Sequence, residues 1–175
     1  MQTLLVATIL AQDRPGIVES IASVVTEHDG NWLESRMCRL GGQFAGILRV
    51  SLPAEREAAL VTALRNLSSQ GITATITTGR AEPTPGGERL RILELVGHDR
   101  PGIVRQISRA LSSRGVNVEE FSTECVSAPM SGESLFKARA VLQIPAACDL
   151  TALKAELEKI AGELMVDVTL EAAVD

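Results

Sequence analysis

Aromatic residues are scarce in this chain of 175 residues, which has three Phe, one Trp and no Tyr. Proteins that bind single-stranded nucleic acid usually stack the bases on aromatic side chains, and this chain has few to offer. The formal net charge of -5 also removes the broad positive field that attracts a phosphate backbone. We therefore expect no direct contact with nucleic acid.

Residues suited to metal, redox and nucleophilic chemistry are few and scattered. The three cysteines show no CxxC spacing, and the two histidines have no Cys, Asp or Glu partner at the spacing of metal ligands. Neither a GxSxG nor a GxGxxG motif is present. These absences predict a protein without a metal, without a cofactor and without enzymatic activity.

Long apolar runs are also missing, since no stretch approaches the roughly 18 apolar residues of a membrane span. The apolar N-terminal segment lacks the basic residues of a signal peptide and meets a charged turn at Asp13. With 45% hydrophobic and 22% charged residues, the composition is that of a soluble globular protein. We expect a cytoplasmic protein with no membrane contact.

One motif occurs twice in the chain. QDRPGIV at residues 12–18 returns as HDRPGIV at residues 98–104, 86 positions later. Between the copies lies AEPTPGGE at residues 81–88, whose prolines and glycines are typical of a linker. An internal duplication predicts two domains, 1–80 and 89–175, joined by this linker.

Each copy has the pattern of a strand, a helix, two strands, a second helix and a last strand. Each copy begins with a strand, Thr3–Ala11 or Leu90–Val96. In the first copy this strand is apolar on both faces, so it is expected at the centre of a sheet. Amphipathic helices and alternating strands follow in the same order in both copies. The predicted fold class is α+β, with two ferredoxin-like βαββαβ domains, each an antiparallel sheet with both helices on one face.

The repeated motif joins the first strand of each copy to its first helix. Its proline is expected in the first helical turn, where a proline loses no hydrogen bond. Asp13 and Asp99 are expected to cap the helix. The hairpin loop at residues 127–134 is longer than its counterpart at 41–43, which predicts a surface that only the second copy has.

A first strand that ends in DRPG, followed by Ile-Val and a helix and later by GVNVEE at residues 115–120, resembles an ACT domain. The whole chain resembles two ACT domains joined by a short linker. HDRPGIV together with NVEEFSTECVSAPMSGESLFKA is similar to the glycine cleavage system transcriptional repressor family. The resemblance implies an amino-acid-responsive regulator that acts through a DNA-binding partner protein, with a small, glycine-like amino acid at the interface between ACT domains.

The repeated turn has the properties of a site for a free amino acid. Unpaired N–H groups at a helix N-terminus attract a carboxylate, and a neighbouring glycine leaves the backbone open to a ligand. An Asp could accept from the ammonium group, and an Asn at the start of the second strand, expected beside the turn in space, offers donors and an acceptor. The candidate ligand-binding residues are Asp13, Gly16, Ile17, Asn31, His98, Asp99, Gly102, Ile103 and Asn117. The same residue types also suit helix caps and turns without any ligand.

The second copy is the better candidate for a ligand site. Where it has RGVNV before the hairpin, the first copy has HDGNW, so that Trp32 replaces a small strand residue. An indole at this position could fill the site of the first copy.

Two other functions remain open at this stage. The chain could be a regulatory subunit that gives amino-acid feedback control of a metabolic enzyme, and the identity of its partner would distinguish this from transcriptional control. A nucleic-acid-binding ferredoxin-like domain is a third hypothesis, against which the acidic charge and the few aromatics count. Open sheet faces favour pairing, either as a homodimer or between the two copies of one chain.

Overall fold

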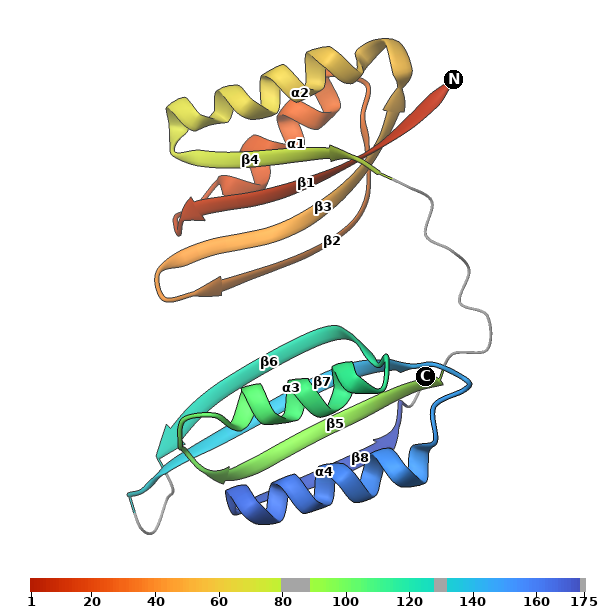
Figure 1. Cartoon of the computed structure of the whole chain (residues 1–175). Helices are drawn as coiled ribbons and strands as arrows, with labels where there is room; N and C mark the ends of the chain where they lie inside the picture. The colour runs from red at the N-terminus through yellow and green to blue at the C-terminus, as the bar shows by residue number, and fades with distance from the viewer. Residues whose placement is uncertain (80–88, 128–131, 174–175) are drawn as a thin grey trace. The chain divides into compact units, whose positions relative to one another are not determined.

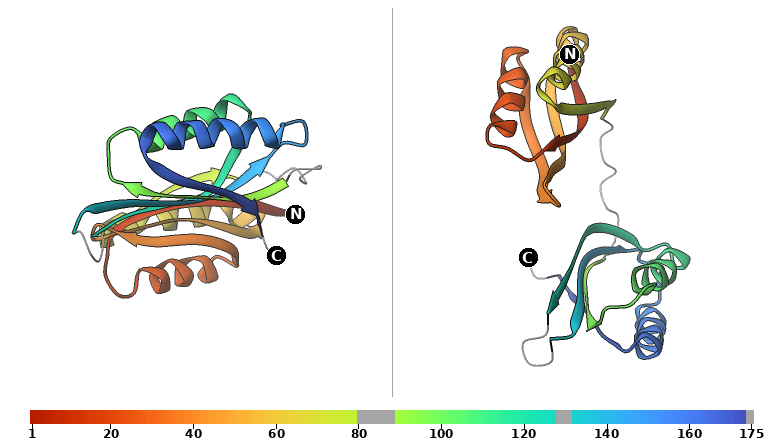
Figure 2. Two further views of the ribbon diagram at one scale, coloured as in Figure 1. Left: turned by 90° about the horizontal axis from the view of Figure 1, so that it is seen from below. Right: turned by 90° about the vertical axis from the view of Figure 1, so that its left-hand side faces the viewer.

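A computed structural model of the chain describes residues 1–79, 89–127 and 132–173. The chain divides into two compact units, Met1–Pro83 and Thr84–Asp175. Each unit is a four-stranded sheet with its two helices on one face (Figure 1, Figure 2). The linker predicted at 81–88 lies outside the described residues, as does part of the long hairpin loop, 128–131.

The N-terminal domain has the predicted order of elements. They are β1 (Gln2–Gln12), α1 (Ile17–Glu27), β2 (Asn31–Leu40), β3 (Gln43–Pro53), a 3-10 turn (Ala54–Arg56), α2 (Glu57–Asn66), a second 3-10 turn (Leu67–Gln70) and β4 (Ile72–Thr78). The strands lie in the order β2-β3-β1-β4, and every neighbouring pair is antiparallel. The apolar β1 is therefore central, as its sequence predicts.

The C-terminal domain repeats this arrangement. Its elements are β5 (Arg89–His98), α3 (Ile103–Ser113), β6 (Asn117–Ser127), β7 (Ser134–Ile144), α4 (Leu150–Leu164) and β8 (Val166–Ala172). The strand order β6-β7-β5-β8 is the same as in the first domain, and all pairs are again antiparallel. Both sheets confirm the α+β, ferredoxin-like fold class.

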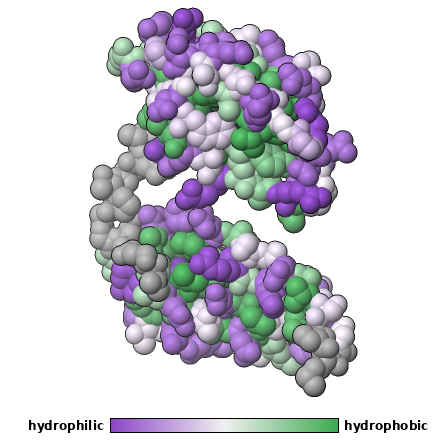
Figure 3. Space-filling view, turned by 180° about the vertical axis from the view of Figure 1, so that it is seen from behind, coloured by the Kyte–Doolittle hydropathy of each residue, from purple (hydrophilic) through white to green (hydrophobic). Residues whose placement is uncertain are grey.

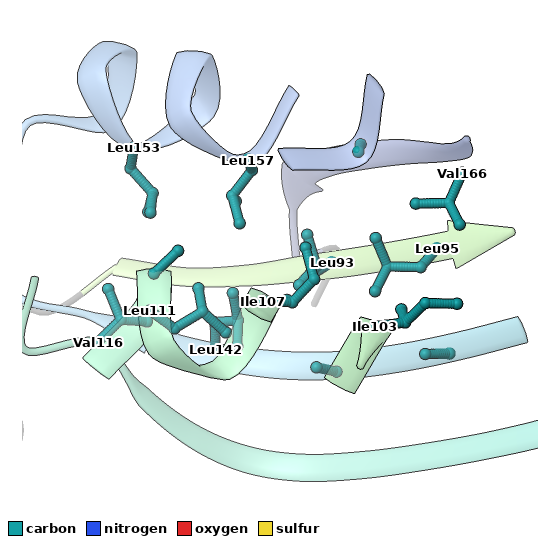
Figure 4. Packing of buried hydrophobic residues seen from close by; sticks show 14 of the residues in the cluster. Leu93, Leu95, Ile103, Ile107, Leu111, Val116, Leu142, Leu153, Leu157 and Val166 are labelled. Atoms are coloured by element: carbon teal, nitrogen blue, oxygen red, sulfur yellow. The ribbon is translucent and has the colours of Figure 1, made fainter. Parts of the chain in front are cut away.

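Each domain has its own hydrophobic core between the sheet and the helices. In the second domain, Leu153 and Leu157 point from α4 toward Leu93 of β5, and Ile107 of α3 packs beside them (Figure 4). Burying one such side chain contributes about 1.5–3 kcal/mol. Among the described residues no polar or charged residue is buried. The side chains of both cores are therefore apolar, and they pack the helices against the sheets.

The alternating residues of β6 predict a half-exposed strand at the edge of a sheet, and β6 is an edge strand. Phe121, Thr123 and Cys125 are exposed, as are the polar residues that alternate with them. A cleft separates part of this strand from α3. Apolar side chains reach the surface of both domains, as the green areas of Figure 3 show.

Candidate ligand site

The repeated motif forms the same tight turn in both domains. Gly16 has φ 90° and ψ -1°, and Gly102 has φ 100° and ψ -8°. These angles fit the third position of a type II turn, which strongly favours glycine, with the preceding proline at the second position. The helices begin one residue later, at Ile17 and Ile103.

This geometry corrects two predictions about the helix starts. The motif's proline precedes the helix and is not in its first turn, because the glycine after it takes the left-handed conformation. Neither helix has a side-chain cap, so Asp13 and Asp99 do not cap them. The first N–H groups of α1 and α3 therefore donate to no capping side chain, and they can meet an anionic group.

Asp13 is held in an ion pair with the edge strand of its own domain. Its Oδ2 lies 2.6 Å from Nε of Arg39 on β2. The Asp13 N–H donates to the carbonyl oxygen of Gly42 at 2.9 Å, which fixes the turn against the β2-β3 hairpin. In the first domain, Arg39 thus neutralises the charge of the Asp13 carboxylate.

Asp99 has a different neighbour at the corresponding position. The register of the two hairpins places Cys125 where the first domain has Arg39, since Arg39 is opposite Phe44 and Cys125 is opposite Phe136. Desolvation, followed by the negative charge of the nearby Asp99 carboxylate and its interaction with the sulfhydryl, raises the pKa of the Cys125 thiol from its ordinary value. Among the described residues, Asp99 forms no ion pair.

His98 and the long hairpin lie beside the turn of the second domain. The Nδ1 atom of His98 is 3.7 Å from Oε2 of Glu133, and both side chains are exposed. The Asp99 N–H donates to the carbonyl oxygen of Ser134 at 3.0 Å, the counterpart of the bond to Gly42 in the first domain. The longer hairpin therefore places additional polar groups next to Asp99 in this domain only.

The two asparagines lie far from the turn of their own domain. Asn117 is opposite Gln143, which is opposite Leu90 at the start of β5, whereas Asp99 follows His98 at the end of β5. Leu90 and His98 are eight residues apart, which is about 26 Å along a strand. The expectation that the asparagine lies beside the turn is wrong within one domain, and the same register separates Asn31 from Asp13.

The remaining candidate residues are two isoleucines of the cores and two glycines of the turns. Ile17 and Ile103 are each 2% exposed, and their side chains anchor the helices in the cores. They can offer a ligand only a backbone N–H. A Cβ at Gly16 would meet no atom within 4 Å, and one at Gly102 would meet only Gln106 Nε2 at 3.9 Å. The positive φ thus explains these glycines, and the space around them is open.

Sequence reasoning identified the turn but missed the contact that distinguishes its two copies. Arg39 and Cys125 occupy equivalent positions of the two repeats, so the difference between them is visible in the sequence. The contact of Arg39 with Asp13 is not visible there, because the two residues are 26 positions apart. No group of three His, Cys, Asp or Glu that could hold a metal occurs in the described part of the chain. None of the helices within the described ranges has the length and apolar content to span a bilayer.

Comparison with known proteins identifies the domain type. Residues 3–77 match the family model described as ACT domain, so the N-terminal domain is an ACT domain. An unknown protein from Galdieria sulphuraria is 29% identical, with a TM-score of 0.84 over 99% of this chain and 100% of that one. A protein described as a glycine cleavage system transcriptional repressor is 19% identical, with a TM-score of 0.74 over 100% of this chain and 99% of that one. No curated protein sequence matches this chain. The tandem ACT-like fold is common to all three chains.

Proposed function

We propose that this chain is an amino-acid-responsive regulator without catalytic activity, which controls a DNA-binding transcriptional regulator by binding to it. The signal is a small amino acid of the size of glycine, bound at the turn of the second domain. The ACT domain type and the sequence similarity of HDRPGIV and NVEEFSTECVSAPMSGESLFKA to the glycine cleavage system repressors support this role. The protein itself reads no DNA, in keeping with its acidic charge.

The observation that carries the proposal is the difference between the two turn carboxylates. Asp13 is paired with Arg39, so an ammonium group would have to displace a guanidinium there. Asp99 faces a neutral thiol and keeps its negative charge available to a cation. The free N–H groups at the start of α3 supply the complementary site for the carboxylate of the same amino acid.

The positions of the asparagines limit the ligand contacts within one domain. A free amino acid is only a few ångströms long and cannot touch Asp99 and Asn117 of one domain. The amino acid at the turn of the second domain therefore does not use Asn117 of that domain. It changes the affinity for a partner only if it binds two states of the regulator unequally.

Calorimetric titration of the full chain with glycine, serine and a panel of larger amino acids tests the ligand site. Asp99→Asn, which keeps the size and removes the charge, is expected to weaken binding by about tenfold or more. Asp13→Asn is the matched control, and it is expected to leave the affinity unchanged. The proposal fails if no amino acid binds at millimolar concentration, or if the two variants behave alike.

The partner decides between transcriptional and metabolic control. Capture by the tagged full chain from a lysate, with and without the amino acid that binds in the titration, is expected to recover a DNA-binding regulator. The recovered amount should change with the amino acid. Recovery of a biosynthetic enzyme instead would favour the role of a regulatory subunit in feedback control.

A further inference from the structure

The second domain has an apolar cleft between α3 and the edge strand β6. Its volume is about 240 Å³. The floor consists of residues that are at most 3% exposed: Leu93, Leu95, Ile107, Leu111 and Ala140. The rim consists of Val104, Val118 and Phe121, which are 41%, 39% and 50% exposed. Ser108 is the one polar residue of the lining.

The first domain shows what such a cleft can hold. The sheet register places Trp32 opposite Val50 and Val118 opposite Leu142, so Val118 stands where the first domain has a tryptophan. Trp32 is half-buried and packs against the core of its domain, and its indole N–H donates to Ser35 Oγ at 3.4 Å. Ser35 in turn corresponds to Phe121 of the rim. An indole thus covers the core in one domain at the position where the other domain has only a valine.

The rim of the cleft leaves the side chains of Val104, Val118 and Phe121 in contact with water. Apolar cavities of about 150 Å³ bind a ring such as benzene, because the ring gains dispersion contacts and removes apolar surface from water. The cleft of the second domain is large enough for one ring system. The hydroxyl of Ser108 can accept a hydrogen bond from an N–H group of a ligand, as the hydroxyl of Ser35 accepts one from the indole N–H of Trp32.

The surroundings of the rim favour a small molecule over a protein. On β6, Glu119 and Glu120 stand between Val118 and Phe121, and on α3 the exposed Arg105 follows Val104. These charges limit the apolar surface to the cleft itself. A stable protein interface needs about 800 Å² on each partner, with a core depleted of charged residues.

We propose that the cleft between α3 and β6 binds a small aromatic molecule of about the size of indole, at a site separate from that of the amino acid. The probe for this site is indole itself. In a methyl NMR titration of the full chain, the shifts of Val104, Ile107, Leu111 and Val118 are expected to saturate together, with a dissociation constant on the order of millimolar. Asp99→Asn should leave this titration unchanged, so the titration tests the cleft independently of the amino-acid site.

Two variants that fill the cleft test where indole binds. Val118→Trp with Phe121→Ser recreates the pair Trp32 and Ser35 of the first domain and is expected to weaken indole binding by about tenfold or more. Ser108→Leu fills the cleft from the helix at an exposed position that tolerates leucine, and it provides a second test if the double variant fails to fold. Trp32→Val is the converse change, and it should create new indole-dependent shifts in Val18 and Val25.

Three results would overturn the proposal. One is the absence of saturable shifts at the cleft methyl groups. Another is indole binding that both filling variants leave unchanged. The third is that the shifts of these methyl groups depend on protein concentration without indole, because a second copy of the chain would then cover the cleft.

Discussion

The guanidinium of Arg39 lies 2.6 Å from the carboxylate of Asp13, and the residue at the position of Arg39 in the second domain is Cys125. An exposed ion pair of this kind contributes only about 0–1 kcal/mol to stability. Under the proposed function its effect on a ligand is larger, because an incoming ammonium group would have to replace a cation that is already bound. We infer that one side chain in each domain sets whether the carboxylate of the repeated turn is available.

Exchanging these side chains should exchange the properties of the two turns. Cys125→Arg places a cation beside Asp99 and is expected to weaken amino-acid binding by about tenfold or more, while stability changes by about 1 kcal/mol or less. Arg39→Cys is expected to add a second, weaker binding event in calorimetry. Cys125→Ser is the control, since it keeps a small neutral donor beside Asp99. Binding by Cys125→Arg with the affinity of the natural protein would contradict this account of the turn.

The raised pKa of Cys125 predicts a slow, pH-dependent reaction with alkylating agents. Only the thiolate reacts with the reagent. Because the pKa of Cys125 is raised, a smaller fraction of it is thiolate at a given pH than for a thiol with an ordinary pKa. Asp99→Asn removes the negative charge beside the sulfur, so the pKa should fall and the rate at pH 8 should rise. Mass spectrometry of the alkylated peptide, followed over a pH series with iodoacetamide, measures this rate.

The comparison for the alkylation series comes from the other domain. Asp13→Asn should leave the rate at Cys125 unchanged, because Asp13 contacts Arg39 and not a thiol. Cys38, which is also exposed, reports any general change in reagent or conditions within the same sample. A rate at Cys125 that is indifferent to Asp99→Asn would show that the carboxylate does not act on this thiol.

The fold was predictable from the sequence because its main signals are local. Alternation of apolar residues and the internal repeat indicate βαββαβ twice, and the apolar β1 takes the central place in the sheet. The dipeptide Pro-Gly favours a type II turn, which is the turn that the structure has. The Asp of the motif predicts a helix cap, but each helix begins four residues after it.

The arrangement of the site was less predictable because its contacts are distant in sequence. Asn117 follows α3 closely in the chain, yet the register of the sheet places it about 26 Å from the turn. The cleft between α3 and β6 depends on one substitution, Trp32 against Val118, whose consequence appears only when both side chains are placed on the sheet.

The same substitution at two glycines of the second domain should have opposite effects. Gly102 has φ 100°, and alanine in this left-handed conformation costs about 1–2 kcal/mol. Gly162 lies within α4, and a Cβ there would meet no atom within 4 Å, so Gly162→Ala should stabilise by about 0.5–1 kcal/mol. Denaturant unfolding followed by circular dichroism gives both values. Equal signs for the two variants would contradict the conformational role of Gly102.

The start of α4 has a true side-chain cap, in contrast to α1 and α3. Oδ1 of Asp149 accepts from the N–H of Thr151 at 2.9 Å and from that of Ala152 at 3.1 Å. Asp149→Ala is expected to destabilise the second domain by about 1 kcal/mol. Asp167→Ala, at an exposed position of β8, serves as a control that removes the same charge without a cap.

Fluorescence can show whether this loss is confined to one domain. Trp32 is the one tryptophan of the chain and lies in the first domain, so its emission reports the unfolding of that domain alone. Asp149→Ala should lower the unfolding midpoint seen by circular dichroism, which follows the helices of both domains, and leave the Trp32 transition unchanged. This separation is expected because each domain buries its own core. A fluorescence midpoint that falls together with the circular dichroism midpoint would show that the two cores unfold as one cooperative unit.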